Sequence, residues 1–429
     1  MEDKNIGSDV MKFFKNGLVF IFLMIFNFAI GADNNYLGTE ELYNFKEVQY
    51  TSPPKGYTPI YINHLGRHGN RYLSNGKGLE YIYGVLVLGE NRDGLTERGK
   101  QLKKDIDIVL KNEDNHFGML SELGKKTQYE IGERMYKNFP EVFGREVIAV
   151  STYVERTRQS MDSFLSGLGH HTDSKKFKIS SNEKVDPILR FFDTDREYLE
   201  YKKQGKWIGE LRVYERREKI PKEFTKKFFT EEFLSKFHED EKFSANLYKI
   251  YTNQFNIDME NILGKYFDSK ELEYFWSDGN VSNFLEKGPS FVGENLPTNI
   301  ALPLLKNFIS TSEEALENGD ISANLRFAHA ETIIPFASLL GIKFASVQTD
   351  NLYAVKDIWK DYQVAPMAAN VQWIFYRDMK NPKRDVLVKM LYNEKEIEFP
   401  IESNMKPYYR WKDIKNYYEK RIEEIEIEN

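Results

Sequence analysis

The stretch from Tyr61 to Ser74, YINHLGRHGNRYLS, is the part of the chain from which the fold is most directly inferred. The apolar run Thr58–Ile62 leads into it and predicts a β-strand. Two histidines, two glycines and two arginines follow within the next nine residues. The pattern therefore predicts a strand that delivers a tight loop of cationic groups.

The residue types in this loop indicate chemistry on a phosphate group. Arg67 and Arg71 carry planar forks that fit tetrahedral oxyanions, and the imidazole of His68 can attack phosphorus. Gly69 has no side chain, so the backbone there can approach a ligand closely. We predict a phosphate-transfer site with His68 as nucleophile. The alternative is a solvated surface loop, since short Arg-His-Gly sequences also arise by chance.

Polar clusters follow two further β-type runs. The run Val147–Thr152 is followed by Arg156 at a strand-to-helix turn, and the run Asn324–Ala328 is followed by His329 and Glu331. Ligands of open α/β sheets bind at the carboxyl ends of the strands. If the three runs share one sheet, the three clusters meet there. The alternative for Arg156, and equally for the neighbouring Arg158, is a solvated position on the helix.

The clusters divide the work of phosphoryl transfer. Arginines and a second histidine, His329, would hold the equatorial oxygens, and Glu331 is the only carboxylate immediately beside either histidine. Glu331 would protonate the leaving oxygen and then activate water. This chemistry requires no metal or other cofactor, and no H-x-H, H-E-x-x-H or D-x-D-G pattern stands out.

Composition limits the other possibilities. The 429 residues are 41% hydrophobic and 29% charged, a globular composition of two or three domains by length. Sixty Lys and Arg residues against 66 Asp and Glu give a net charge of −6, which does not support bulk nucleic-acid binding. The absence of cysteine excludes thiol chemistry, disulfides and thiolate metal sites.

Residues 1–32 resemble a signal peptide rather than part of the fold. A basic segment from Met11 precedes the apolar core Leu18–Ala32, which is short for a membrane span of about 20 residues. Small residues allow cleavage near Asp33, and Met11 would be a natural start. We expect a secreted or periplasmic protein with no membrane association beyond this segment. The alternative is an uncleaved N-terminal anchor.

The rest of the chain predicts an α/β protein whose catalytic domain is discontinuous. Residues 186–295 carry helical patterns near 195–216, 222–237 and 243–266, and we interpret them as an inserted all-helical domain. Residues 33–185 and 296–429 then form the catalytic domain. There we expect a helix over Thr332–Leu340, with Pro335 in its first turn, strands at 344–347 and 371–376, and a hairpin near 386–401.

Together these motifs resemble the histidine phosphatase superfamily, specifically its acid phosphatase/phytase branch. RHGxR early and His329-Ala330-Glu331 late, with GMLSELGKKTQYEIGERM, STYVERTRQSMDSF and LRFFD between them, are similar to the multiple inositol polyphosphate phosphatase group. The resemblance implies a mixed sheet flanked by helices, a helical cap, and His68 as nucleophile. It assigns Glu331 as proton donor and Arg67, Arg71, Arg156 and His329 as phosphate ligands. Two departures are Leu73 in place of the usual proline and the lack of cysteine.

The leading hypothesis is a phosphatase of inositol polyphosphates, a small-molecule substrate class. A broad acid phosphatase for sugar phosphates or bisphosphoglycerate and a non-catalytic phosphate-binding protein are the alternatives. Candidate pocket cations are Lys77, Arg190, Arg196 and the lysine-rich helices near 202–227. We expect His64 to be packed at the strand end, and His170, His171 and His238 to lie on the surface.

Overall fold

A mixed β-sheet forms the centre of the structure. The computed structural model describes residues 36–428, and its strands lie in the order β3-β2-β4-β1-β5-β6-β7, with β8 paired to β6. Strands β1 to β4 run parallel to one another, and β5 to β8 add antiparallel partners. The strands are β1 (Tyr57–Arg67), β2 (Glu146–Ser151), β3 (Phe177–Ser181), β4 (Ile321–Ala328), β5 (Asn370–Asp378), β6 (Leu387–Tyr392), β7 (Lys395–Ile397) and β8 (Tyr409–Arg410). The predicted α/β class with a mixed sheet is confirmed.

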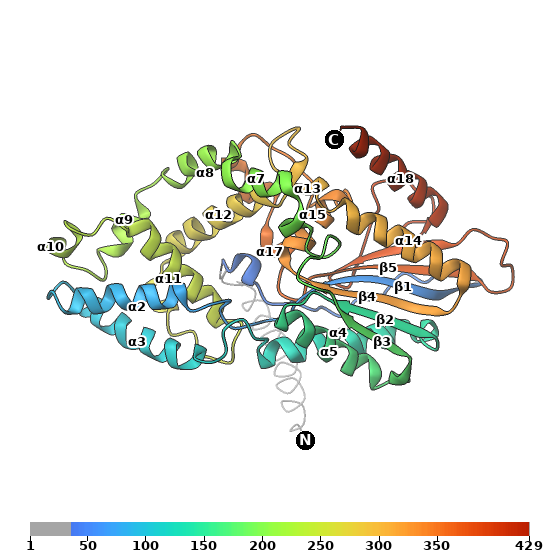
Figure 1. The fold of residues 1–429 in the computed structure, drawn as a ribbon, viewed down its shortest axis with the longest axis horizontal. Helices are drawn as coiled ribbons and strands as arrows, with labels where there is room; N and C mark the ends of the chain where they lie inside the picture. Colours follow the sequence, from blue (N-terminus) through green and yellow to red (C-terminus); the bar gives the residue numbers. More distant parts are fainter. Residues whose placement is uncertain (1–35, 429) are drawn as a thin grey trace, which may run out of the picture. The chain divides into compact units, whose positions relative to one another are not determined.

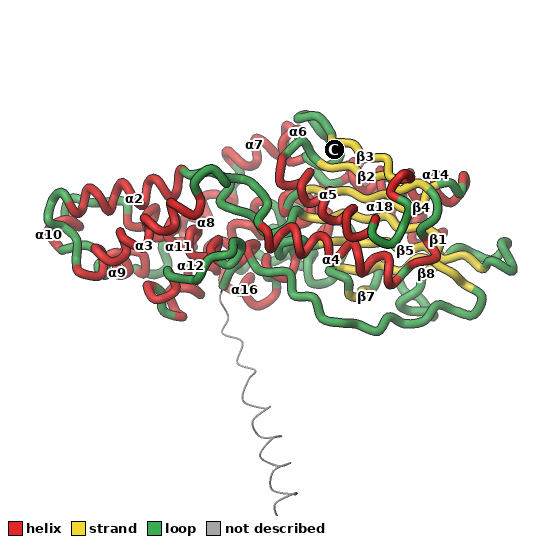
Figure 2. Tube along the Cα trace, turned by 90° about the horizontal axis from the view of Figure 1, so that it is seen from below, coloured by secondary structure: helices red, strands yellow, loops and turns green. Residues whose placement is uncertain are grey.

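Helices cover both faces of this sheet (Figures 1 and 2). The helices are α2 (Lys77–Glu90), α3 (Glu97–Glu113), α4 (Glu122–Asn138), α5 (Glu155–Gly169), α6 (Phe191–Thr194), α7 (Arg196–Gln204), α8 (Trp207–Glu215), α9 (Ile220–Thr225), α10 (Glu231–Leu234), α11 (Asp240–Gln254), α12 (Ser269–Glu286), α13 (Leu296–Asn299), α14 (Leu302–Asn318), α15 (Ala330–Leu339), α16 (Val355–Ile358), α17 (Asp361–Val364) and α18 (Trp411–Glu428). Helices α14 and α18 pack on one face through Phe308 and Tyr418 against Trp373. Helices α4 and α5 pack on the other face, where Phe164 meets Phe327. Strand β4 is buried at every position, because it is covered on both faces.

A second hydrophobic core lies within the helical part of the chain. It joins side chains of α2 and α3, such as Leu79 and Ile106, to Phe224 of α9, Leu247 of α11 and Phe275 of α12. Figure 2 shows these helices away from the strands. This core therefore draws on a segment outside residues 186–295, and the boundaries of the two domains stay a prediction.

Several local predictions need correction. The strand expected at 344–347 is wrong: these residues form turns and loop, and the apolar Phe344 packs on Tyr392 instead of joining the sheet. The helix predicted over 243–266 ends at Gln254, the rest of that range is turns and loop with a short 3₁₀ helix at Gly264–Tyr266, and the next helix, α12, begins at Ser269. Helix α15 begins at Ala330, so Pro335 lies in its second turn rather than its first.

The helical pattern near 195–216 is divided into α7 and α8, and the pattern near 222–237 into the short helices α9 and α10. The remaining predicted elements are present, with modest differences at their ends. Helix α4 starts at Glu122 because Ser121 caps it, and strand β5 and the β6–β7 hairpin follow where they were expected. The signal-peptide prediction lies outside the described residues. Within residues 36–428, no helix combines the length and apolarity needed to cross a membrane.

Candidate active site

The ends of three parallel strands bring the predicted clusters together. Arg67 at the end of β1 lies opposite Ala328 at the end of β4, and Ser151 at the end of β2 lies opposite Phe327. Because the strands are parallel, the segments that follow them leave the sheet at the same edge. His68, Arg156 and His329 therefore meet, as the sequence predicted.

Backbone hydrogen bonds hold the loop of His68 to its neighbours. The N–H of His68 donates to the carbonyl of Ala328 at 3.0 Å, and the carbonyl of His68 accepts from the N–H of Ala368 at 3.0 Å. The N–H of Gly69 donates to Oγ of Ser160, in α5, at 3.0 Å. The loop is thus attached to the end of β4, to α5 and to the segment before β5.

The imidazole of His68 is oriented by its own loop. Nδ1 lies 2.9 Å from the carbonyl oxygen of Gly69, and since a carbonyl only accepts, Nδ1 carries the proton. Nε2 is then unprotonated, and no described residue forms a hydrogen bond with it. Burial and the charges of Arg156 and Arg67 hold the pKa of His68 well below its usual value. The ring is therefore neutral and can act as a nucleophile.

Four arginines around the histidines have donors without acceptors. Among the described residues, the buried Nε atoms of Arg67, Arg71, Arg156 and Arg190 lack a hydrogen-bond partner. Burial, helped by neighbouring arginines, lowers the pKa of Arg67 and of Arg156 to about 10. Buried polar groups are normally paired, so this set of unpaired donors is suited to an anion with several oxygens.

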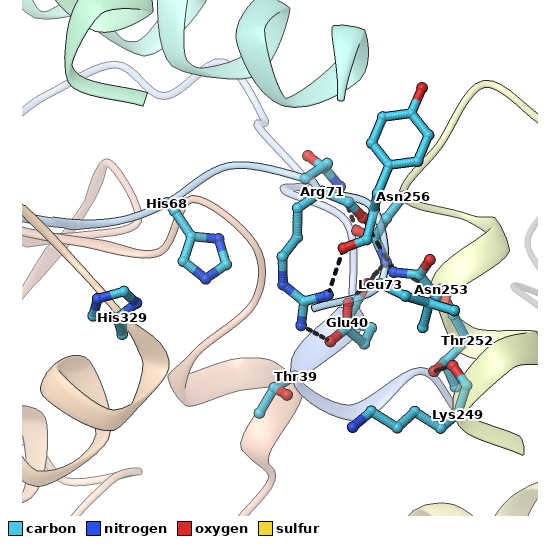
Figure 3. Close-up of polar contacts among 12 residues, drawn as sticks. Thr39, Glu40, His68, Arg71, Leu73, Lys249, Thr252, Asn253, Asn256 and His329 are labelled. Atoms are coloured by element: carbon cyan, nitrogen blue, oxygen red, sulfur yellow. Dashed lines mark hydrogen bonds and ion pairs between the residues drawn. The ribbon is translucent and has the colours of Figure 1, made fainter. Parts of the chain in front are cut away.

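Other bonds fix the positions of the arginines. Nη1 of Arg67 donates to the carbonyls of Ala365, at 2.6 Å, and of Thr39. Nη2 of Arg71 lies 2.6 Å from Oε1 of Glu40, which belongs to the short 3₁₀ helix η1 (Gly38–Glu40). Figure 3 shows this pair beside His68 and Asn256. The guanidinium groups are thus held by the N-terminal residues Thr39 and Glu40 and by Ala365, far along the chain.

His329 occupies the N-cap of α15 and faces His68, with ring centroids 5.7 Å apart. Its Nε2 lies 2.9 Å from Nη1 of Arg190 and 3.0 Å from Oγ1 of Thr152. A guanidinium only donates, so Nε2 accepts from Arg190, while Nδ1 lies 3.5 Å from Nη2 of Arg156. Burial and the charge of Arg156 hold the pKa of His329 well below its usual value. The His329 ring is therefore neutral, and it lies between the guanidinium groups of Arg156 and Arg190.

Glu331 is paired with a lysine that the sequence analysis did not single out. Its Oε1 lies 3.3 Å from Nζ of Lys287, the residue directly after α12. The Glu331 side chain is 40% exposed and that of Lys287 only 16%. Burial opposes ionisation of Glu331, but the ammonium of Lys287 outweighs it and holds the pKa of Glu331 well below its usual value.

Of the other cationic residues considered in the sequence, one lies in the site and the rest lie on the surface. Arg190, weighed only as a pocket cation, contacts His329 and stacks on Tyr153 and Phe192 with 5.0 Å to each ring centroid. Arg196 is exposed, and Lys77 is exposed beside a cavity of about 180 Å³ that includes Leu73 and Lys249. Arg158 is paired with Glu155 on the surface.

The remaining histidines lie where they were expected. His64 is buried between Phe164 and Phe327, while His170 and His238 are exposed and His171 is partly exposed. Among residues 36–428, no group of three or more His, Asp or Glu side chains is arranged to hold a metal ion.

Sequence comparison identifies the class of protein that this fold and site define. The profile of the histidine phosphatase superfamily (branch 2) matches residues 61–393, so the chain belongs to that family. The human multiple inositol polyphosphate phosphatase 1 is 23% identical over 401 residues, which cover 84% of this chain and 79% of the human protein.

Solved structures show the same fold. The Bifidobacterium longum multiple inositol polyphosphate phosphatase in complex with inositol hexasulfate has a TM-score of 0.78 and 23% identity, covering 89% of this chain and 97% of that one. The phytase from D. castellii has a TM-score of 0.66 and 15% identity, covering 91% of this chain and 85% of that one. The predicted family and fold are confirmed.

Proposed function

We propose that this histidine phosphatase hydrolyses phosphomonoesters of inositol polyphosphates through a phosphohistidine intermediate. The observation that carries the proposal is the set of four buried arginine Nε–H groups without acceptors around a neutral histidine with a free Nε2. A phosphate group supplies the oxygens that these donors lack, and it places phosphorus within reach of the imidazole.

The residues then take the following roles. Nε2 of His68 attacks phosphorus, and the Gly69 carbonyl keeps the Nδ1 proton as the ring becomes positively charged. Arg67, Arg71, Arg156 and His329 bind the equatorial oxygens and stabilise the charge of the transition state. Glu331 delivers a proton to the leaving oxygen and afterwards activates water.

The substrate class rests on similarity and on charge. A relative of the same fold binds inositol hexasulfate, an analogue with many negative charges, and Arg190 adds a further cation beside His329. One observation favours the second candidate, a broad acid phosphatase: the carboxylate of Glu40 at Arg71 would repel an adjacent substrate phosphate. We further propose that residues 1–32 direct export of the protein.

Phosphate release from inositol hexakisphosphate in the presence of EDTA tests the function. We expect release by the wild-type protein, loss of at least about 10³-fold in His68→Ala, and normal release in the matched control His238→Ala. Acid-labile labelled phosphate should be trapped on the wild-type protein and not on His68→Ala. Release from small esters alone would support the broad acid phosphatase, and no release from any ester would contradict both.

A further inference from the structure

The ion pair between Lys287 and Glu331 bears on the source of the catalytic proton. A residue that protonates a leaving alcohol must itself carry a proton when the ester bond breaks. Glu331 instead lies 3.3 Å from an ammonium group in the structure. A carboxyl group in such a pair is ionised, so the free enzyme holds no proton on Glu331 at ordinary pH.

The structure keeps Lys287 in this position. The preceding helical turn is fixed by Phe284 against Trp359, with ring centroids 5.7 Å apart, and by the hydroxyl of Tyr201, which donates to the carbonyl of Leu285 at 2.7 Å. Within the described chain, Glu331 is the only carboxylate that pairs with Lys287. Glu331 lies in the first turn of α15, where the helix N-terminus also favours a negative charge.

The charges around Glu331 come from several elements, and most of them are positive or neutral. Lys287 at the end of α12, Arg67 at the end of β1 and Arg156 in α5 are cations that act on it. His329 and Tyr198, both neutral, are further titratable groups on which Glu331 acts. Glu286, the neighbour of Lys287, is a further carboxylate that acts on this lysine.

We propose that Lys287 is a positioning residue that keeps Glu331 ionised, so that the proton for the leaving alcohol is carried in by the monoanionic phosphate ester. This inference rests on the proposed phosphatase function and specifies the ionic form of its substrate. Phosphomonoesters lose their second proton near pH 6, so a monoanion is available in mildly acidic solution.

The step balances without any other reactant. The bond between Nε2 of His68 and phosphorus forms as the bond between phosphorus and the ester oxygen breaks. The proton moves from the phosphate hydroxyl to a carboxylate oxygen of Glu331 and on to the ester oxygen, which leaves as an alcohol. Glu331 is again ionised, and it can accept a proton from the water that cleaves the phosphohistidine.

The pH dependence of kcat/KM tests the proposal with the full-length enzyme. Two alkyl phosphates are compared, glycerol 2-phosphate and a trifluoroethyl phosphate whose second ionisation is more acidic. We expect the alkaline limb to follow the ionisation of the substrate. In Lys287→Met we expect the acidic limb to move up by one pH unit or more while the alkaline limb stays in place. Lys287→Arg, which keeps the charge, and Lys227→Met, which breaks the comparable Lys227–Glu271 pair, should keep both limbs.

An alkaline limb that ignores the substrate, or a plateau of kcat/KM that rises in Lys287→Met by the factor through which the acidic limb moves, would overturn the proposal, because Glu331 would then work in its protonated form on the dianionic ester. A direct titration separates this inference from the function itself. The ¹³C-carboxyl signal of Glu331, assigned with Glu331→Gln, should titrate at higher pH in Lys287→Met than in the wild type. If the titration of Glu331 were unchanged in Lys287→Met, the proposed role of Lys287 in keeping Glu331 ionised would be refuted, even if the protein hydrolysed no ester. A shifted titration in a protein that hydrolyses no ester would count against the phosphatase function alone.

Discussion

The carboxylate of Glu40 lies 2.6 Å from Nη2 of Arg71. One of the arginines assigned to the substrate phosphate is therefore already paired with an anion of the protein itself. Both side chains are largely buried, with 10% of Arg71 and 13% of Glu40 exposed. Asn256 donates from Nδ2 to the other carboxylate oxygen at 3.2 Å and holds Glu40 in place. Any phosphate oxygen at Arg71 must therefore share this guanidinium with Glu40.

Replacement of Glu40 by Gln should tighten phosphate binding. Glutamine keeps an oxygen that accepts from Arg71 but removes the negative charge that competes with the ligand. We expect the inhibition constant of inorganic phosphate to fall about three- to tenfold, or about 0.6–1.4 kcal/mol. Glu122→Gln, an exposed carboxylate of α4, is the matched control. An unchanged or higher constant in Glu40→Gln would show that Arg71 is not shared.

Gly69→Ala should disturb the site because the new methyl group would clash with the backbone of Gly124. A Cβ at Gly69 would lie 2.7 Å from the carbonyl oxygen of Gly124, and that contact belongs to the backbone of α4, which cannot rotate away. We expect a loss of about 1–3 kcal/mol in stability and a lower kcat, measured by thermal unfolding and phosphate release. Gly84→Ala in α2, where a Cβ meets open space, should instead leave both values equal or improved.

Glu113 should make the enzyme less stable as the pH rises through the acidic range. It is buried at the end of α3, accepts from the N–H of Leu73 at 3.0 Å, and burial raises its pKa from 4.5 to about 7. Between these pH values the folded state binds more protons than the unfolded state, so the free energy of unfolding falls with rising pH. Glu113→Gln should remove this dependence and add about 1–3 kcal/mol at pH 7.5.

Denaturant unfolding of Glu113→Gln at pH 5 and pH 7.5 provides the measurement. Glu97→Gln changes an exposed carboxylate of the same helix and should follow the wild type. Equal stability of Glu113→Gln and the wild type at pH 7.5 would mean that the buried carboxyl finds a compensating partner when ionised.

His64 should contribute pH dependence of the opposite sign. Burial and the charge of Arg326 lower its pKa to about 3, and its Nδ1 lacks a partner in the described structure. Between pH 3 and 6.5 the unfolded state binds the additional proton, so stability falls as the pH falls. Between pH 7 and pH 4 the free energy of unfolding of His64→Leu should fall by about 1–3 kcal/mol less than that of the wild type. The variant should also retain phosphatase activity. Loss of activity would assign His64 to the site.

The three strand-to-loop junctions could be predicted because the residue types suited to phosphate chemistry stand directly beside sequence patterns that predict strands. Each places arginine or histidine directly after a β-type run, and parallel pairing then brings the three together. Strand β3 could not be found in this way, because its residues are mostly exposed and show no alternation between buried and exposed positions. Its pairing with β2 is set by the sheet, not by its own sequence.

Glu40 and Lys287 were missed for a related reason. Glu40 belongs to a three-residue helix that lies against Asn256 and Arg71, and nothing in its neighbourhood in the sequence indicates this. Lys287 ends a helix whose direction depends on packing against Trp359. Long-range contacts place both residues, whereas sequence patterns describe only short-range structure.

The attachment of the His68 loop to the ends of β4 and of the segment before β5 has a consequence for biosynthesis. The chain emerges from the ribosome with its N-terminal part first, so RHGNR is made long before Ala328 and Ala368, whose backbones hold His68. A chain released by a premature stop before these residues would contain the nucleophile but no assembled site. Catalysis would then report that translation has passed Ala368.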